Sequence, residues 1–143
     1  MKERIRSKIR FLTKKYNTND PLVLAQCLNI KVFFVPLGKI AGFYKYMKHN
    51  RCIYINSCIS DAAFLRVVIA HELGHAIFHA KENCTFMGAN TLLLTSKIER
   101  QANIFAAHLL ITDDLLQEFS GFTQYQFCDC TGYPIELLKL KIS

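Results

Sequence analysis

The spacing of apolar and polar residues first separates an N-terminal helix from the rest of the chain. Within residues 1–15, apolar side chains recur at i, i+4 and i+7, which places them on one face of a helix. They are Ile5, Ile9 and Leu12. A second, short helix is expected to follow, because Asp20 is a typical N-cap and Pro21 a typical first-turn residue, and it should run through about residue 28.

Segments that favour β-structure come next. Three of them are expected to be strands: 30–35, 42–48 and 51–56. The last two are separated only by His49 and Asn50, which predicts a hairpin.

The second half of the chain is predicted to be mainly helical. The long apolar run at 62–80 indicates a buried helix, which Ser60 and Asp61 are suited to cap, and residues 81–95 are expected to form a loop. Further helices are expected at 97–111, 113–119, 123–130 and 134–141. Helices, a small sheet and then more helices make the fold class α+β, with the whole chain, residues 1–143, forming one domain.

Charge is concentrated at the N-terminus. The chain has a net charge of +7, and residues 1–15 contribute most of it, with seven basic residues and one acid. A solvated cationic face is the simpler interpretation of this stripe. Docking to an acidic protein or to nucleic acid is the alternative.

Two features bear on the compartment. No apolar run approaches the roughly 18 residues that a membrane-spanning helix needs, and the basic start of the chain is not followed by the apolar core of a signal peptide. A cytoplasmic protein is therefore expected, with its six cysteines reduced. Cys128 and Cys130 form no C-x-x-C pair and are interpreted as incidental thiols rather than a second metal site.

The candidate chemistry lies in the predicted buried helix, at His71-Glu72-Leu73-Gly74-His75. At 3.6 residues per turn the two histidines lie about 40° apart on one face, so both can reach one metal ion, typically Zn²⁺. Glu72 lies at the edge of that face, where it can take a proton from a metal-bound water without binding the metal itself. The motif therefore predicts two zinc ligands, His71 and His75, and a general base, Glu72.

A catalytic zinc site needs a third protein ligand. Glu99 is the best placed, because it lies on a helical stripe with small and apolar neighbours, and a carboxylate directed into a core needs a partner. However, Ser96-Lys97-Ile98-Glu99 also fits a capping box, in which Glu99 would only satisfy a helix N-terminus. His79 is a weaker alternative, because helical rotation carries it about 80° away from the direction of His71. His108 is also weaker, because it falls on the other flank of the helix that carries Glu99 and is typical of a partly buried histidine. The remaining downstream candidates are Glu82, Cys84 and Asp113. From the residues alone, Glu99 is equally well interpreted as a metal ligand and as a helix cap.

Several stretches together resemble the ImmA/IrrE family of metallopeptidases. They are Ile53–Asn56, the His71–His75 motif and the E-x-x-A-N-x-F-A-A-x-L-L stretch that begins at Glu99. The likeness runs nearly end to end. Asn90–Leu93 and Gly132–Leu137 resemble the short members that occur with prophages and integrative elements.

This resemblance implies more about the site than the residues do. It implies that Glu99 is the third metal ligand and that Asn103 lies beside the ligands and supports them. The family's usual second acid in this stretch is Gln101 here, a departure that is not expected to affect the metal. The expected fold is zincin-like, with a small antiparallel or mixed sheet packed on the helix that carries the motif.

The function expected from the motif and the resemblance is zinc-dependent endopeptidase activity. Zinc lowers the pKa of a water molecule to about 7, and Glu72 accepts its proton as the water attacks a peptide carbonyl. The resemblance implies that the substrate is a helix-turn-helix repressor of a mobile element. The alternative is a non-catalytic zinc module that binds a regulatory protein without cutting it, but such a site has no need of a base beside its ligands. No helix-turn-helix is recognised in this chain, so direct DNA binding is not expected.

Two parts of the substrate site stay open. A peptide is expected to pair with an exposed strand edge beside the helix, formed by 42–48 or by 51–56. The developing oxyanion needs a donor besides zinc. The candidates are Tyr44, Tyr46, His49, Tyr54 and His79.

Overall fold

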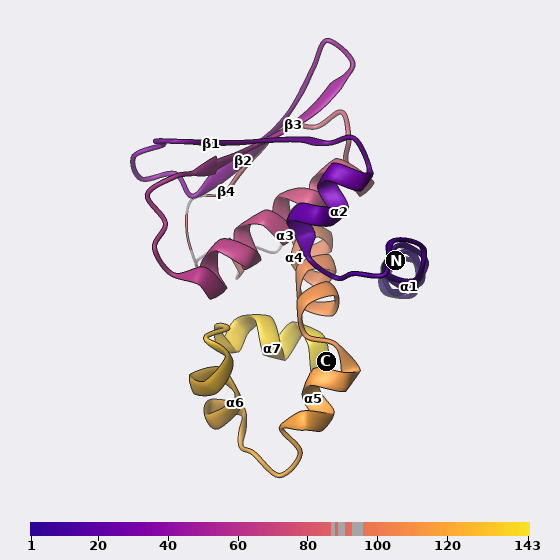
Figure 1. The fold of residues 1–143 in the computed structure, drawn as a ribbon, viewed down its shortest axis with the longest axis vertical. Coiled ribbons are helices and arrows are strands. Elements are labelled where there is room, and N and C mark those ends of the chain that lie inside the picture. Colours follow the sequence, from indigo (N-terminus) through magenta and orange to yellow (C-terminus); the bar gives the residue numbers. More distant parts are fainter. Residues whose placement is uncertain (87, 89–90, 93–95) are drawn as a thin grey trace.

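A four-stranded mixed sheet lies on one side of a set of helices in the computed structural model, which describes residues 1–86, 88, 91–92 and 96–143 (Figure 1). The strands are β1 (Lys31–Val35), β2 (Gly42–Met47), β3 (Asn50–Asn56) and β4 (Cys84–Phe86). Their order in the sheet is β1-β3-β2-β4. β3 is parallel to β1 and antiparallel to β2, and β4 pairs antiparallel with β2. The predicted α+β class is thus confirmed.

The two faces of the sheet differ, because side chains alternate along each strand. Tyr44 and Ile53 are paired neighbours, and both are fully buried on the face that lies against the helices. On the opposite face, the ring of Tyr54 stacks against those of Phe33 and Phe43. The predicted hairpin is also present, but its two-residue turn is Lys48 and His49, at φ 51° and 66°, rather than His49 and Asn50, because Asn50 pairs with Met47 as the first residue of β3.

Helix α3 (Ala62–Phe78) runs beneath the sheet and packs against α4 (Lys97–Leu110) (Figure 1). The Asp61 carboxylate caps α3 by accepting hydrogen bonds from the backbone N–H groups of its first turn. Gly74 allows the two helices to approach closely, because a Cβ there would lie 3.2 Å from the Cα of Ala102 and 3.2 Å from the ring of Phe105. This close approach brings the motif on α3 to the start of α4.

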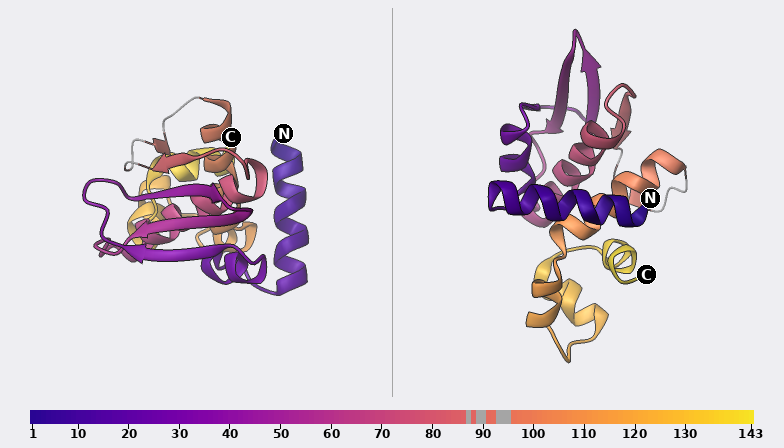
Figure 2. Two further views of the ribbon diagram at one scale, coloured as in Figure 1. Left: turned by 90° about the horizontal axis from the view of Figure 1, so that it is seen from above. Right: turned by 90° about the vertical axis from the view of Figure 1, so that its right-hand side faces the viewer.

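The remaining helices surround this pair. α1 (Lys2–Tyr16) buries its predicted apolar stripe and lies along one side of the molecule, packed on α4 (Figure 2). α2 (Pro21–Cys27) begins at the predicted cap, Asp20. α5 (Asp113–Glu118), α6 (Gln124–Thr131) and α7 (Ile135–Ile142) gather at the end of the molecule far from the sheet (Figure 1). Among the described residues, no helix combines the length and apolar character needed to cross a membrane.

Three predicted boundaries and pairings were wrong. Residues 84–86, expected within a loop, form β4, because Gly42–Tyr44 offers them a strand edge. The motif helix ends at Phe78 rather than at residue 80, and His79 takes a non-helical conformation as its C-cap. The edge expected at 51–56 is not available, because β3 lies between β1 and β2.

The expected edge at 42–48 is only partly open, because its first three residues pair with β4. β4 therefore forms the border of the sheet on this side. Part of the predicted 81–95 loop, and with it Asn90 and Leu93 of the family-like stretch, lies outside the described residues.

Candidate metal centre

Three side chains from two helices converge beneath β4. His71 and His75 of α3 are fully buried, and their Nε2 atoms lie 3.1 Å apart. The Glu99 carboxylate of α4 reaches both, with Oε2 2.9 Å from His71 Nε2 and Oε1 3.1 Å from His75 Nε2. One ligand atom from each of the three lies within 4.8 Å of the other two. This is the compact nitrogen and oxygen donor set that a single metal ion requires.

The structure excludes one of the two interpretations of Glu99. Ser96 is the N-cap of α4, but its side chain makes no capping hydrogen bond, so no capping box forms. Instead, one turn into the helix, the Glu99 side chain is directed toward α3 and contacts two imidazoles. The capping interpretation was therefore wrong, and Glu99 lies where a third ligand would.

The protonation states of the cluster suit a cation. Burial opposes ionisation of Glu99, but its hydrogen bonds to His71 and His75 outweigh this effect and lower the pKa of the carboxyl to about 2. Burial lowers the pKa of His71, which favours the neutral imidazole. An ionised carboxylate and neutral imidazoles are the forms in which these residues bind metal ions.

The carboxyl group of Glu72 lacks hydrogen-bond partners. Its side chain is fully buried beside the two histidines, and neither carboxylate oxygen has a hydrogen-bond partner among the described residues. Burial, together with the negative charge of Glu99, raises its pKa well above the usual range. A buried carboxyl group without a partner is costly. A bound cation with a water molecule would supply both the missing charge and the missing donor, so these residues fit a metal ion.

A chain of hydrogen bonds supports His75 from behind. Its Nδ1 lies 3.0 Å from Nδ1 of His79, and Nε2 of His79 lies 2.6 Å from Oε1 of Gln101. Because an amide oxygen only accepts, His79 carries its proton on Nε2, and its Nδ1 is left to accept a hydrogen bond from the N–H at His75 Nδ1. His75 is then left with a lone pair on Nε2, the atom that faces the cluster.

The sequence did not reveal this chain. The sequence indicated His79 only as a possible ligand or oxyanion donor, and Gln101 only as a departure from the family pattern. The end of α3 at Phe78 turns His79 back toward His75, and Gln101 lies two residues beyond Glu99 on α4. The i, i+4 spacing of His79 after His75 was the signal that indicated the contact.

Asn103 lies beside His71. It is buried, and its side-chain amide donates a hydrogen bond to the backbone carbonyl of Thr91 at 2.9 Å. Its side chain raises the pKa of His71, although burial has the larger, opposite effect. Asn103 Oδ1 and His71 Nδ1 are both buried and have no well-formed hydrogen bond among the described residues.

The other candidates lie elsewhere or have other partners. His108 faces a separate pocket, and Asp113 pairs with Lys141 at 2.9 Å. Cys84 lies near the cluster, but burial and the adjacent carboxylates, led by Glu99, raise the pKa of its thiol to about 12, which keeps it protonated. Glu82 is exposed, and its backbone carbonyl accepts a weak hydrogen bond from the Cys84 thiol.

The five candidates for an oxyanion donor have other roles in the structure. Tyr44 donates its hydroxyl hydrogen bond to the Ala80 carbonyl, and Tyr54 belongs to the opposite face of the sheet. The side chains of Tyr46 and His49 contact each other at the hairpin. His79 is directed at His75. None of the five points a free donor into the cluster within the described ranges, so the oxyanion donor stays unassigned.

Known proteins similar to this chain share its motif-bearing region. A peptidase family profile, Peptidase_M78, described as the IrrE N-terminal-like domain, matches residues 25–126. The chain is 40% identical over 140 residues to a protein of Bacillus phage phi105 named uncharacterized immunity region protein 2, covering 96% of this chain and 88% of the phage protein. It is 31% identical over 146 residues to Metallopeptidase ImmA of Bacillus subtilis strain 168, covering 97% of this chain and 84% of that protein.

Proposed function

Because the chain belongs to the ImmA/IrrE family of metallopeptidases, we propose that it is a zinc-dependent endopeptidase that cleaves a specific regulatory protein. The observation that carries this proposal is the fully buried, unpartnered carboxyl of Glu72 beside His71, His75 and Glu99. A metal site built only for stability has no use for such a group, whereas hydrolysis of a peptide bond needs a base at this position.

Each residue of the cluster has a role in this proposal. His71, His75 and Glu99 would hold the ion, and zinc would polarise the scissile carbonyl and lower the pKa of a water molecule to about 7. Glu72 accepts a proton from the attacking water and then passes it to the leaving amine.

Neighbouring residues orient the ligands. His79 and Gln101 hold His75 in the tautomer whose Nε2 lone pair faces the ion, and Asn103 is placed to do the same for His71. Such partners fix ring orientation and raise the affinity of the site for metal. Gln101 replaces the family's usual acid here, and the proposal is that its amide oxygen still provides the acceptor that His79 needs.

The substrate is proposed to add as a strand at the border of the sheet. The outer edge of β4 is the strand edge nearest the cluster, since the ring of Phe86 lies 4.8 Å from the ring of His71. Backbone hydrogen bonds to β4 would hold an extended peptide beside the cluster. This replaces the walls expected at 42–48 and 51–56.

The regulatory protein is proposed to be a helix-turn-helix repressor of a mobile element, met in the cytoplasm. Support comes from the name of the phage relative, which assigns that protein to an immunity region. The interpretation of residues 1–143 as one metallopeptidase domain stays a prediction.

The test is cleavage of the repressor encoded beside this gene by the zinc-loaded protein. A discrete product is expected with the wild type, and Glu72→Gln should reduce its rate by roughly a hundredfold or more while retaining the metal. Stable binding of the repressor without a product would instead favour the non-catalytic module. Equal cleavage by both proteins would remove Glu72 from the mechanism.

A further inference from the structure

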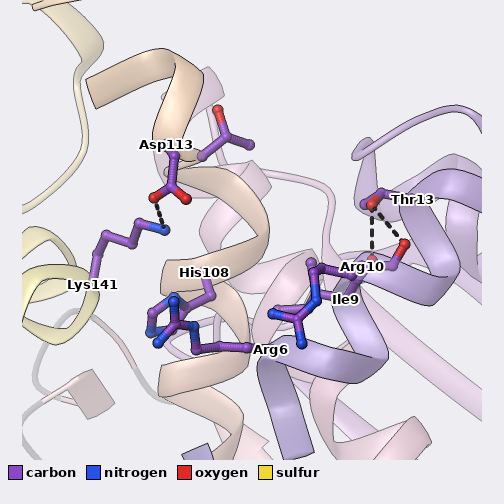
Figure 3. Close-up of a pocket in the computed structure, with 8 residues that line it drawn as sticks. Arg6, Ile9, Arg10, Thr13, His108, Asp113 and Lys141 are labelled. Carbon is purple, nitrogen blue, oxygen red and sulfur yellow. Dashed lines mark hydrogen bonds and ion pairs between the residues drawn. The ribbon is translucent and has the colours of Figure 1, made fainter. Parts of the chain in front are cut away.

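A second pocket lies nine residues beyond Glu99 along α4, about 13 Å further at 1.5 Å per residue. It is formed where α1, α4 and α7 meet, and its volume is about 180 Å³ (Figure 3). Its polar lining includes Arg6 of α1, His108 of α4, Thr112 and Lys141 of α7. None of these belongs to the metal cluster or takes part in the proposed reaction.

His108 is the unusual residue of this pocket. Only 7% of its surface is exposed, and its Nε2 is buried with no hydrogen-bond partner among the described residues. An unpaired buried nitrogen is unfavourable, and each such group in a native structure calls for a missing partner. His108, Arg6 and Lys141 all line this pocket (Figure 3), so a group that entered it would meet all three.

The charges around His108 leave an excess of positive charge. Lys141 is paired with Asp113 at 2.9 Å, and Arg10 is paired with Glu3 at 3.0 Å; Asp113 and Arg10 also line the pocket. Arg6 forms no ion pair with any residue that the structure describes. Its guanidinium therefore offers the pocket a set of planar donors without a carboxylate to receive them.

The titration of His108 reflects the same environment. Burial is the main cause that lowers its pKa to about 4, and the nearby cations Lys141, Lys2 and Arg6 add to this, while Asp113 acts weakly in the opposite direction. The imidazole is therefore neutral at pH 7, and one ring nitrogen can donate a hydrogen bond. An anion in the pocket would reverse the effect of the cations and raise the pKa of His108.

We propose that this pocket binds a small oxyanion, and that phosphate or a phosphate monoester is the class that fits it best. Arg6 supplies the charge, His108 supplies a buried, unpaired Nε2 that donates in the tautomer that carries the ring proton there, and Thr112 supplies a hydroxyl. The Thr112 oxygen already accepts a hydrogen bond from the Leu115 N–H at 3.1 Å, so its own proton is free to be donated. Donors converging from several directions suit the oxygens of a tetrahedral anion better than a planar carboxylate.

The experiment is a titration of the full-length, metal-loaded protein with inorganic phosphate, followed through the ring resonances of His108 by NMR. Saturable binding with an upward shift of the His108 pKa is expected. Arg6 is exposed, so Arg6→Gln should fold normally, and it should weaken phosphate binding about tenfold or more, as expected for a lost charge-assisted hydrogen bond. Lys14→Gln removes one charge from the same helix outside the pocket and should bind as the wild type does.

Three results would overturn the proposal. The first is the same response to sodium chloride at the same ionic strength as to phosphate, which would show only general screening. The second is phosphate binding by Arg6→Gln as tight as that of the wild type. Acetate binding as tightly as phosphate would assign the pocket to carboxylates instead. Because the readout is His108 and not cleavage, these outcomes are independent of the proposed peptidase activity.

Discussion

Replacement of Gln101 by leucine tests how the metal centre is oriented. The change removes the acceptor that lies 2.6 Å from His79 Nε2, while the three residues proposed to bind the ion stay unchanged. His79 then has no fixed tautomer, so His75 loses a reliable acceptor for its Nδ1 proton at the 3.0 Å contact. Loss of such a partner typically lowers metal affinity by about ten- to a hundredfold. This corresponds to about 1.4 to 2.8 kcal/mol.

The assay is competition for zinc against a chromophoric chelator, with circular dichroism to verify the fold and ¹⁵N shifts of His75 to report its tautomer. Gln101→Glu retains an acceptor oxygen and should bind zinc within a few-fold of the wild type. Gln117→Leu, an exposed site on α5, is the matched control and should not change affinity. Wild-type zinc affinity in Gln101→Leu, with the His75 shifts unchanged, would refute the reasoning, because the tautomer would then not depend on His79.

Three further predictions concern packing, charge and docking. Gly74→Ala should lower the free energy of unfolding by about 1 to 3 kcal/mol in urea, because its Cβ would press on the Cα of Ala102 at 3.2 Å; an unchanged midpoint would contradict this. The free energy of unfolding should fall as the pH decreases from about 6.5 to about 4. In this range the unfolded chain binds a proton at His108, with the ordinary histidine pKa of about 6.5, whereas the folded chain binds it only near pH 4. The variant His108→Phe should lose this part of the pH dependence, and an unaltered profile would exclude His108 as its source. Replacement of both Arg4 and Lys8, on the exposed side of α1, by glutamate should slow cleavage of the whole partner protein but not of a short peptide spanning the cut site. If the variant cleaved both substrates at the wild-type rates, α1 would be only a solvated surface.

The sequence predicted most of the helices and strands because their signals are local. The apolar stripe of α1, the Asp20 and Asp61 caps and the hairpin turn each depend on neighbouring residues. β4 was missed because it is only three residues long, and it pairs with a strand about 40 positions earlier in the chain. That pairing also decides which strand edge lies beside the candidate site.

The residues of the candidate site also differ in whether local sequence signals were enough to predict them. His71, Glu72 and His75 follow from spacing within one helix, so the sequence was sufficient to select them. The position of Glu99 depends on how closely α3 and α4 pack, which Gly74 controls and which helical periodicity does not report. The contact between His79 and Gln101 joins residues 22 positions apart and requires α3 to end at Phe78, although the apolar run continues beyond it.

The central claim is that His71, His75 and Glu99 form one metal site. Zinc titration of the purified apoprotein, alongside Glu99→Gln and the exposed control Glu118→Gln, tests it most directly. The wild type and Glu118→Gln should bind one zinc ion per chain tightly, and Glu99→Gln should bind it much more weakly, because the amide lacks the charge that a zinc ligand provides. Equal zinc affinity in all three proteins would contradict the account.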